Sequence, residues 1–225
     1  MRSLALKTIL GYAFLLLSLA ASLFAPAWTL HFWQAWVYLV LFAAASAGIT
    51  AYLWKHDPAL LERRVKAGPI AEKELNQKLI QIFASLAFVG IMILPSLDHR
   101  FSWSSVPLGF VILGDMLVAL GFWVVFHVYK ENSFAAATIA VAADQKVIST
   151  GPYAIVRHPM YSGALQLLLG TPLALGSWWG ILMFLPMLLV MIFRLLDEES
   201  FLRKFLAGYD GYCRKVPYRL VPSVW

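Results

Sequence analysis

Long apolar runs separated by short polar connections dominate this chain. Each run is near the roughly 20 residues that an α-helix needs to cross about 30 Å of hydrocarbon, so the pattern predicts membrane-spanning helices. The six predicted spans are residues 8–24, 32–54, 79–97, 106–128, 161–175 and 178–196.

The last two runs are predicted to form a tight helical hairpin. The fifth run is short, and only Gly176 and Ser177 separate it from the sixth. Six full crossings, or five crossings with a re-entrant piece, both fit this pattern. The predicted fold class is therefore an all-α, polytopic integral membrane protein with five to six transmembrane helices.

Composition agrees with this class, since 61% of the residues are hydrophobic and only 13% are charged, too few to cover a soluble domain. The net charge of +6 comes from basic residues spread over several loops, so no nucleic-acid partner is predicted. Cys213 is the only cysteine, which excludes an intrachain disulfide and a cysteine-based metal cluster, and no metal site is predicted. Without repeats or linkers, residues 1–225 read as one domain, with four spans over 1–128 and a polar region over 129–225.

The basic residues predict the orientation in the membrane. Of the 18 Lys and Arg residues, all but Arg100 fall on one set of connections, which the positive-inside rule makes cytoplasmic together with both termini. An aromatic belt is predicted at the opposite face, formed by Trp28, Trp33, Trp103, Trp178 and Trp179. No small-residue cleavage site precedes Trp28, so the first run is predicted to stay as a span.

The first cytoplasmic connection predicts a short helix on the membrane surface. Asp57 is a suitable cap, Pro58 suits the first helical position, and Gly68 with Pro69 would end the helix. Its apolar face is expected to contain Leu60, Leu61 and Val65.

Polar residues that could bind a ligand or take part in a reaction gather after residue 129. Pro159 is expected to open the fifth helix, leaving Arg157 and His158 at its amino terminus, where free N–H groups and the helix dipole favour an anion. The alternative is that Arg157 only anchors the helix among lipid headgroups.

A second polar cluster follows the sixth run. Three consecutive acids, Asp197, Glu198 and Glu199, stand near the carboxyl end of a helix, where they oppose its dipole. A cationic ligand would explain them. The alternative is a solvated helix end with an ion pair between Arg194 and Glu198, which share one face.

These residues resemble a known family. The resemblance rests on GPY at 151–153, RHPMY at 157–161, Gly163, the pair Glu198 and Glu199, and the closing YCRKVPYRLVPSVW. The pattern resembles the isoprenylcysteine carboxyl methyltransferase family and its bacterial relatives and, more distantly, phospholipid N-methyltransferases. It covers residues 132–225.

The resemblance implies an integral membrane methyltransferase that uses S-adenosyl-L-methionine. Glu198 is then a cofactor ligand with a catalytic role, and Arg194 is a catalytic residue placed toward the substrate. The other cofactor-binding residues that the resemblance implies are Gln145, Lys146, Val147, Ile148, Tyr153, His158, Pro159, Met160 and Tyr161. The pocket would be built on the cytoplasmic side from loops, helix ends and the C-terminal segment, because no strand with a glycine-rich turn is present for a soluble nucleotide-binding fold.

The expected partner is a lipophilic small molecule or lipid, such as a prenyl-cysteine-like carboxylate, which enters from the surrounding membrane lipids. No obligate protein partner is indicated. Methyl transfer is an in-line displacement that needs alignment, so no glutamate has to act as a base.

Two other functions stay open. Sterol reductases that use NADPH share a similar membrane core and a YC...VPYR segment, but this chain differs from them at Met160 and over 197–199. A non-catalytic membrane protein that keeps only the fold is the other alternative. The sequence does not decide whether Asp115, His127, Glu131 or Asn132 take part.

Overall fold

The computed structural model describes residues 2–65, 75–135 and 145–225, and these are helical without any strand. The helices are α1 (Arg2–Ala27), α2 (Trp33–His56), α3 (Pro58–Val65), α4 (Leu75–Phe101), α5 (Leu108–Glu131), the 3₁₀ turn η2 (Gly151–Ala154), α6 (Pro159–Ala174), α7 (Ile181–Phe205) and α8 (Tyr209–Lys215). The predicted all-helical class is confirmed for the described residues.

Four of these helices are long and apolar enough to cross a membrane. They are Leu4–Ala27, Trp33–His56, Gln77–Phe101 and Leu108–Glu131, which contain almost all of the first four predicted runs. α6 has 16 residues, and α7 has 25 but carries charged residues in its last third. The chain is thus a membrane protein in which α6 and α7 differ in character from the four apolar helices.

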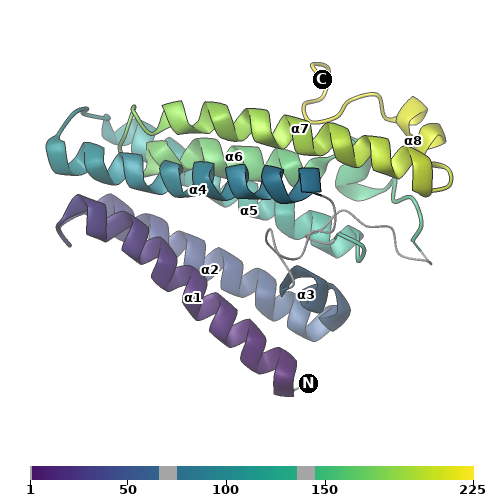
Figure 1. Cartoon of the computed structure of the whole chain (residues 1–225), viewed down its shortest axis with the longest axis horizontal. Coiled ribbons are helices and arrows are strands. Elements are labelled where there is room, and N and C mark those ends of the chain that lie inside the picture. The colour runs from purple at the N-terminus through teal and green to yellow at the C-terminus, as the bar shows by residue number, and fades with distance from the viewer. Residues whose placement is uncertain (1, 66–74, 136–144) are drawn as a thin grey trace.

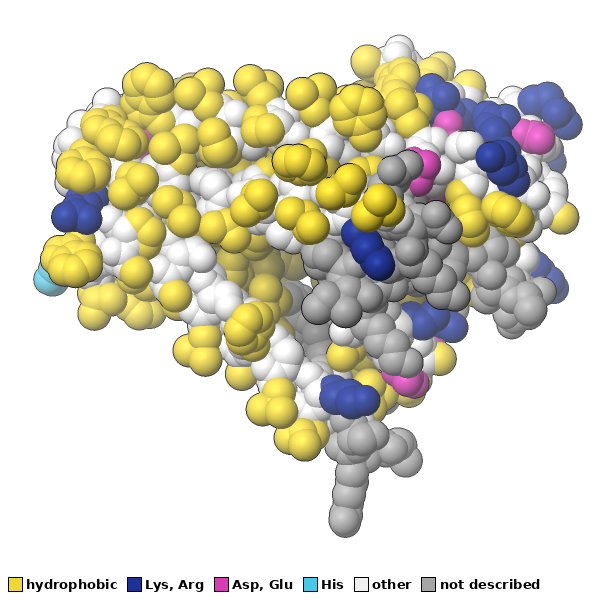
Figure 2. All heavy atoms as spheres, in the orientation of Figure 1, with side chains coloured by type: hydrophobic (Ala, Val, Ile, Leu, Met, Phe, Trp, Pro, Cys, Tyr) yellow, Lys and Arg dark blue, Asp and Glu magenta, His cyan; other side chains and the backbone are white. Residues whose placement is uncertain are grey.

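The bundle has two unlike ends. The tryptophans predicted for an aromatic belt are exposed at one end of the bundle, at the ends of α1 and α4, the start of α2 and the α6–α7 turn, and we call this the tryptophan end: Trp28, Trp33, Trp103, Trp178 and Trp179. Lys, Arg, Asp and Glu side chains gather at the opposite end, over α3, α7 and α8, whereas most of the remaining face is apolar (Figure 2). We call this second end the site end.

α6 and α7 form the predicted hairpin and lie side by side (Figure 1). The turn is possible because Gly176 adopts a φ of 70°, a left-handed conformation that costs glycine little. The next residue, Ser177, donates from its hydroxyl to the carboxylate of Asp98, the buried acid at the end of α4. Ser104 donates to the same carboxylate from its backbone N–H at 2.7 Å and from its hydroxyl. One acid thus ties α4, the α4–α5 connection and the hairpin together.

α5 and α6 approach closely because glycines face each other along their contact. A Cβ atom on Gly121 would lie 2.6 Å from the carbonyl oxygen of Gly163, and one on Gly114 would lie 2.2 Å from the backbone nitrogen of Ala174. Both distances are far inside van der Waals contact, so these positions admit no side chain. The two contacts hold α5 and α6 antiparallel, with the first turns of α6 beside the middle of α5.

α1 and α2 diverge from the other helices toward the site end, where α3 packs (Figure 1). The predicted cap is confirmed, since Leu60 donates its N–H to Asp57 Oδ1 at 2.8 Å. Leu60 and Leu61 are buried against Leu53 and Tyr129, so the apolar face contacts protein rather than lipid. Val65 is exposed instead of sharing that face, and the predicted end at residues 68 and 69 lies outside the described residues.

Candidate functional site

The C-terminal segment crosses the amino terminus of α6. Arg157 donates its backbone N–H to Tyr218 O at 2.9 Å, and His158 donates its own to Arg219 O at 3.0 Å. The hydroxyl of Ser162 donates to Leu220 O at 2.7 Å. The tail therefore satisfies backbone and side-chain donors at a helix end that water or a ligand would otherwise satisfy.

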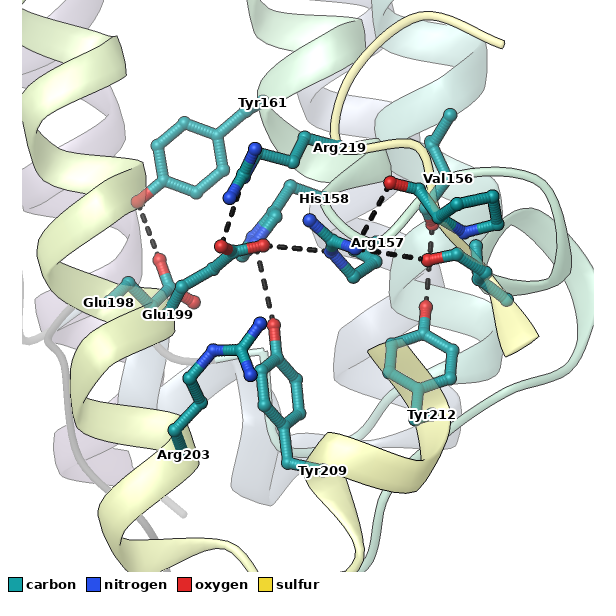
Figure 3. Close-up of polar contacts among 12 residues, drawn as sticks. Val156, Arg157, His158, Tyr161, Glu198, Glu199, Arg203, Tyr209, Tyr212 and Arg219 are labelled. Carbon is teal, nitrogen blue, oxygen red and sulfur yellow. Dashed lines mark hydrogen bonds and ion pairs between the residues drawn. The ribbon is translucent and has the colours of Figure 1, made fainter. Parts of the chain in front are cut away.

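Glu199 forms the centre of the site end (Figure 3). Its Oε1 atom accepts from Arg157 Nε at 2.8 Å and lies 3.3 Å from His158 Nε2, while Oε2 accepts from Arg219 Nε at 3.0 Å. Burial alone would raise the pKa of this carboxyl, but hydrogen bonds from His158 and Arg219, together with the charges of His158 and Arg157, lower it from 4.5 to about 2. Glu199 is therefore ionised at neutral pH and binds α7 to α6 and the tail.

The structure corrects both sequence interpretations of Arg157. Arg157 is 7% exposed, so it does not anchor the helix among lipid headgroups. Its Nε donates to Glu199, and its Nη1 donates to Val216 O and Pro217 O, so the anion beside it at this helix terminus is the protein's own carboxylate. The sequence reasoning missed this partnership. The only local signal was the coincidence of basic residues before α6 and acids on α7.

Glu198 occupies a different environment from its neighbour. Successive side chains on a helix point about 100° apart, so Glu198 does not point in the direction of Glu199 and its basic partners. It faces α6 instead. Its Oε2 atom accepts from the Tyr161 hydroxyl at 2.6 Å (Figure 3). The Tyr161 ring meets the His158 ring edge-on, with centroids 5.7 Å apart. Glu198, Tyr161 and His158, which the sequence predicted to share one site, are thus brought together.

Arg194 lies one turn before Glu198 and contacts α4. Its Nη1 atom donates to Gln77 Oε1 at 2.7 Å, and it also interacts with the hydroxyl of Tyr161. Gln77 in turn donates to the carboxylate of Asp197. Gln77 was not among the predicted residues, because it lies in the N-terminal half, far from the recognised motifs.

The predicted cofactor loop lies next to α8. Of its four predicted residues, Lys146 is exposed, whereas Gln145, Val147 and Ile148 are half-buried. Val147 packs against a buried cluster formed by Leu206, Tyr209, Tyr212 and Val216, which Tyr153 also contacts. Residues 136–144 lie outside the described residues.

Two residues of α5 and its C-cap hold this loop. Asn132 donates from Nδ2 to the Tyr153 hydroxyl at 2.8 Å, and the side chain of Glu131 accepts from the Thr150 hydroxyl. Tyr212 fixes the backbone of the same turn by donating to Tyr153 O at 2.7 Å. Burial raises the pKa of the Tyr153 phenol above its ordinary value, so it is neutral and able to donate.

The remaining predicted residues have mixed positions. Pro159 is buried at the first position of α6, as predicted, whereas Met160 packs toward the cluster of α3 and Tyr129. Asp115 is half-buried on α5 beside Gly114, which packs against the tryptophan end of α6, so the structure does not bring it to the site. His127 faces its own helix, with Nδ1 2.9 Å from Trp123 O.

Comparison with known proteins finds relatives of the part of the chain that runs from α5 to α7. A family model described as phospholipid methyltransferase matches residues 110–207, which contain most of α5, all of α6 and α7. Over 77 residues the chain is 38% identical to Protein-S-isoprenylcysteine O-methyltransferase of Schizosaccharomyces pombe, a match that covers 33% of this chain and 32% of that protein.

A second relative has a different activity in its name. Over 95 residues the chain is 33% identical to Delta(14)-sterol reductase TM7SF2 of Mus musculus, covering 39% of this chain and 22% of that protein. The matches thus span about a third or less of the length of these curated relatives. The resemblance to the isoprenylcysteine-methyltransferase-like family is confirmed by the family model and the yeast methyltransferase, and it supports a membrane methyltransferase.

Proposed function

We propose that this chain is an S-adenosyl-L-methionine-dependent methyltransferase that acts on a lipophilic acceptor at the cytoplasmic membrane face. The observation that carries the proposal is the contact between Tyr161 on α6 and Glu198 on α7, with Arg194 beside both. All three residues lie within the region that matches the methyltransferase family model.

The residues present fit the cofactor. S-adenosylmethionine carries a sulfonium, an ammonium and a carboxylate, and therefore needs an acidic group together with hydrogen-bond donors. Glu198 is half-buried, and the hydrogen bond from the Tyr161 hydroxyl uses only part of the accepting capacity of its carboxylate. Val147 and Tyr153 supply apolar surface nearby. When bound, the cofactor supplies an electrophilic methyl group.

The chain's own residues bind and align rather than move protons. Glu198 and Tyr161 would hold the cofactor, with the loop residues Gln145, Lys146, Val147 and Ile148, Tyr153, Pro159 and Met160 around it. The side chain of His158 is committed to Glu199, so it would act by orienting Tyr161. Arg194 would position an acceptor, best of all an anionic one such as a carboxylate, which needs no base before in-line displacement.

The membrane arrangement follows from the same distribution of charges. With both termini and the site end in the cytoplasm, a polar cofactor arrives from water while the acceptor arrives from the bilayer. The printed name of the yeast relative, an isoprenylcysteine O-methyltransferase, favours a prenyl-cysteine-like carboxylate, and other small hydrophobic or lipid nucleophiles fit the same chemistry. We assign five to six crossings, with residues 129–225 forming the catalytic region of one domain.

The match to a sterol reductase makes an NADPH-dependent reductase the second candidate. Calorimetric titration of the purified protein in detergent separates the two. We expect saturable binding of S-adenosylmethionine, no binding of NADPH, and transfer of label from methyl-tritiated cofactor to extracted lipids. Binding of NADPH alone would favour the reductase, and binding of neither would favour a protein that keeps only the fold.

A further inference from the structure

Gln77 lies at the beginning of α4 and is only 3% exposed, although its side chain is polar. Its carbonyl oxygen accepts from Arg194 Nη1 at 2.7 Å, and its amide nitrogen donates to Asp197 Oδ2. The start of α4 lies beside the C-terminal half of α7 (Figure 1). A neutral side chain from the N-terminal half therefore bridges a cation and an anion at the site end.

An amide suits this pair of charges because of its two different ends. A guanidinium can only donate and an ionised carboxylate can only accept, so a bridging group must present one acceptor and one donor. Arg194 and Asp197 are three residues apart on α7 and so face the same neighbouring helix. A carboxylate or an apolar side chain at position 77 would lose at least one of the two bonds.

We propose that Gln77 is a positioning residue that holds the Arg194 guanidinium toward Tyr161 and the methyl acceptor, an inference that rests on the proposed function. Arg194 interacts with the Tyr161 hydroxyl, and that hydroxyl donates to Glu198. A series of contacts thus leads from α4 to the carboxylate assigned to the cofactor. Without Gln77, the long arginine side chain gains rotamers in which it no longer faces the acceptor.

Gln77 lies outside residues 110–207, which match the family model. The contact therefore joins the family-like catalytic region to a part of the chain that this match does not cover. In this arrangement a residue of α4 affects the orientation of the acceptor through Arg194, and its side chain bonds to Arg194 and Asp197 rather than to the residues assigned to the cofactor.

The experiment uses the full chain in detergent, methyl-tritiated S-adenosylmethionine, and mixed micelles of extracted membrane lipids doped with N-acetyl-S-farnesyl-L-cysteine. Gln77→Met keeps the volume of the side chain and removes both hydrogen bonds. We expect the half-saturating concentration of acceptor micelles to rise about tenfold, the scale of one charge-assisted hydrogen bond. The calorimetric Kd for the cofactor should stay within about twofold of wild type. Gln81→Met, one turn later on α4, is the matched control and should change neither value.

A rescue variant separates positioning from simple support of α4. Gln77→Glu alone places a carboxylate against Asp197 and should impair acceptor use at least as much as Gln77→Met. Adding Asp197→Asn restores the hydrogen bond between the two positions, with the amide now at 197 as donor and the carboxylate at 77 as acceptor. The half-saturating concentration of acceptor micelles should then return to within about threefold of wild type.

Three results would overturn the inference. The double variant could stay as impaired as Gln77→Glu, or Gln77→Met could weaken cofactor binding as much as acceptor use; either result would make Gln77 a brace for α4 only. If the wild-type chain bound no cofactor and transferred no label, the proposed function itself would fail, and this inference with it.

Discussion

Two buried carboxylates at opposite ends of the bundle, Asp98 and Glu199, are stabilised in different ways. Asp98, at the tryptophan end, is 1% exposed and accepts hydrogen bonds from the neutral groups of two serines. Glu199, at the site end, is 4% exposed and contacts two arginines and a histidine. Each carboxylate joins three segments of the chain.

The difference separates a carboxylate held by neutral donors from one held by cations at the end that we propose for the chemistry. In the described part of the chain, the donors to Asp98 are two serine hydroxyls and one backbone N–H, so this carboxylate is held without a charged partner. The Glu199 cluster collects the charges needed to hold the tail, and the adjacent Glu198 bonds to the neutral Tyr161. One member of the acidic pair is therefore structural, and the other is the one that we propose for the cofactor.

The largest expected effect is on the Glu199 cluster itself. Glu199→Gln leaves buried cations without a counter-charge, a loss of about 3–5 kcal/mol of folding free energy, so the thermal unfolding midpoint in detergent should fall by roughly 10 °C or more. Asp98→Asn, which weakens hydrogen bonds from neutral donors and leaves no buried cation unpaired, should cost about 1–2 kcal/mol. Equal shifts of the two midpoints would contradict the distinction between the ends.

Glu198→Ala should remove cofactor binding without this loss of stability. Among the described residues Glu198 accepts one hydrogen bond, from the neutral hydroxyl of Tyr161, so the unfolding midpoint should shift by no more than about 3 °C. The affinity for S-adenosylmethionine should fall at least about thirtyfold, because a carboxylate facing a cation is lost. Unchanged affinity in the calorimetric titration would reject the assigned role of Glu198.

Gly121→Ala tests the close contact between α5 and α6, which positions α6 in the bundle. The added methyl group would lie 2.6 Å from the Gly163 carbonyl oxygen and push α6 away from α5, at a cost of about 1–3 kcal/mol. We expect a lower unfolding midpoint and weaker cofactor binding. Gly109→Ala on the same helix is the control, since its Cβ would meet nothing within 4 Å. Equal unfolding midpoints and equal cofactor affinities of the two variants would show that the close contact between α5 and α6 does not position the site.

A further expected effect concerns acid pH. The pKa of Glu199 is lowered from 4.5 to about 2 in the folded protein, so its contribution to stability is fully present above about pH 4.5 and is lost as the pH falls toward 2. The unfolding midpoint of wild type should therefore decline over that window. In Glu199→Gln this part of the decline should be missing, and an unchanged pH profile would show that other carboxyls cause it.

Much of the local structure could be predicted from particular residues. Pro159 begins α6 because its fixed φ and missing N–H suit a first helical position, and Asp57 caps α3 for the reasons that favour acids at helix starts. The hairpin was predictable because so few residues separate two apolar runs. These features depend on neighbours in the sequence, so a reader of the sequence has all the necessary information.

Arg157 and Gln77 show where prediction stopped. The side-chain partners of Arg157 are 42 to 60 residues away in sequence, and those of Gln77 are 117 and 120 residues away. Such contacts depend on how each helix is rotated and on which ends meet. Neither hydropathy nor residue spacing contains that information.

The sequence by itself determined a helical membrane chain with its charged groups at one end. This was possible because the free energy of transferring a segment from water to lipid is a sum over the side chains of that segment. Only the tertiary structure decided which of two adjacent glutamates became the centre of an ionic cluster. A rotation of about 100° along α7 separates them, and packing against α6 and the tail assigns one to the interior. The same packing brought Gln77 from the other half of the chain to the arginine beside them.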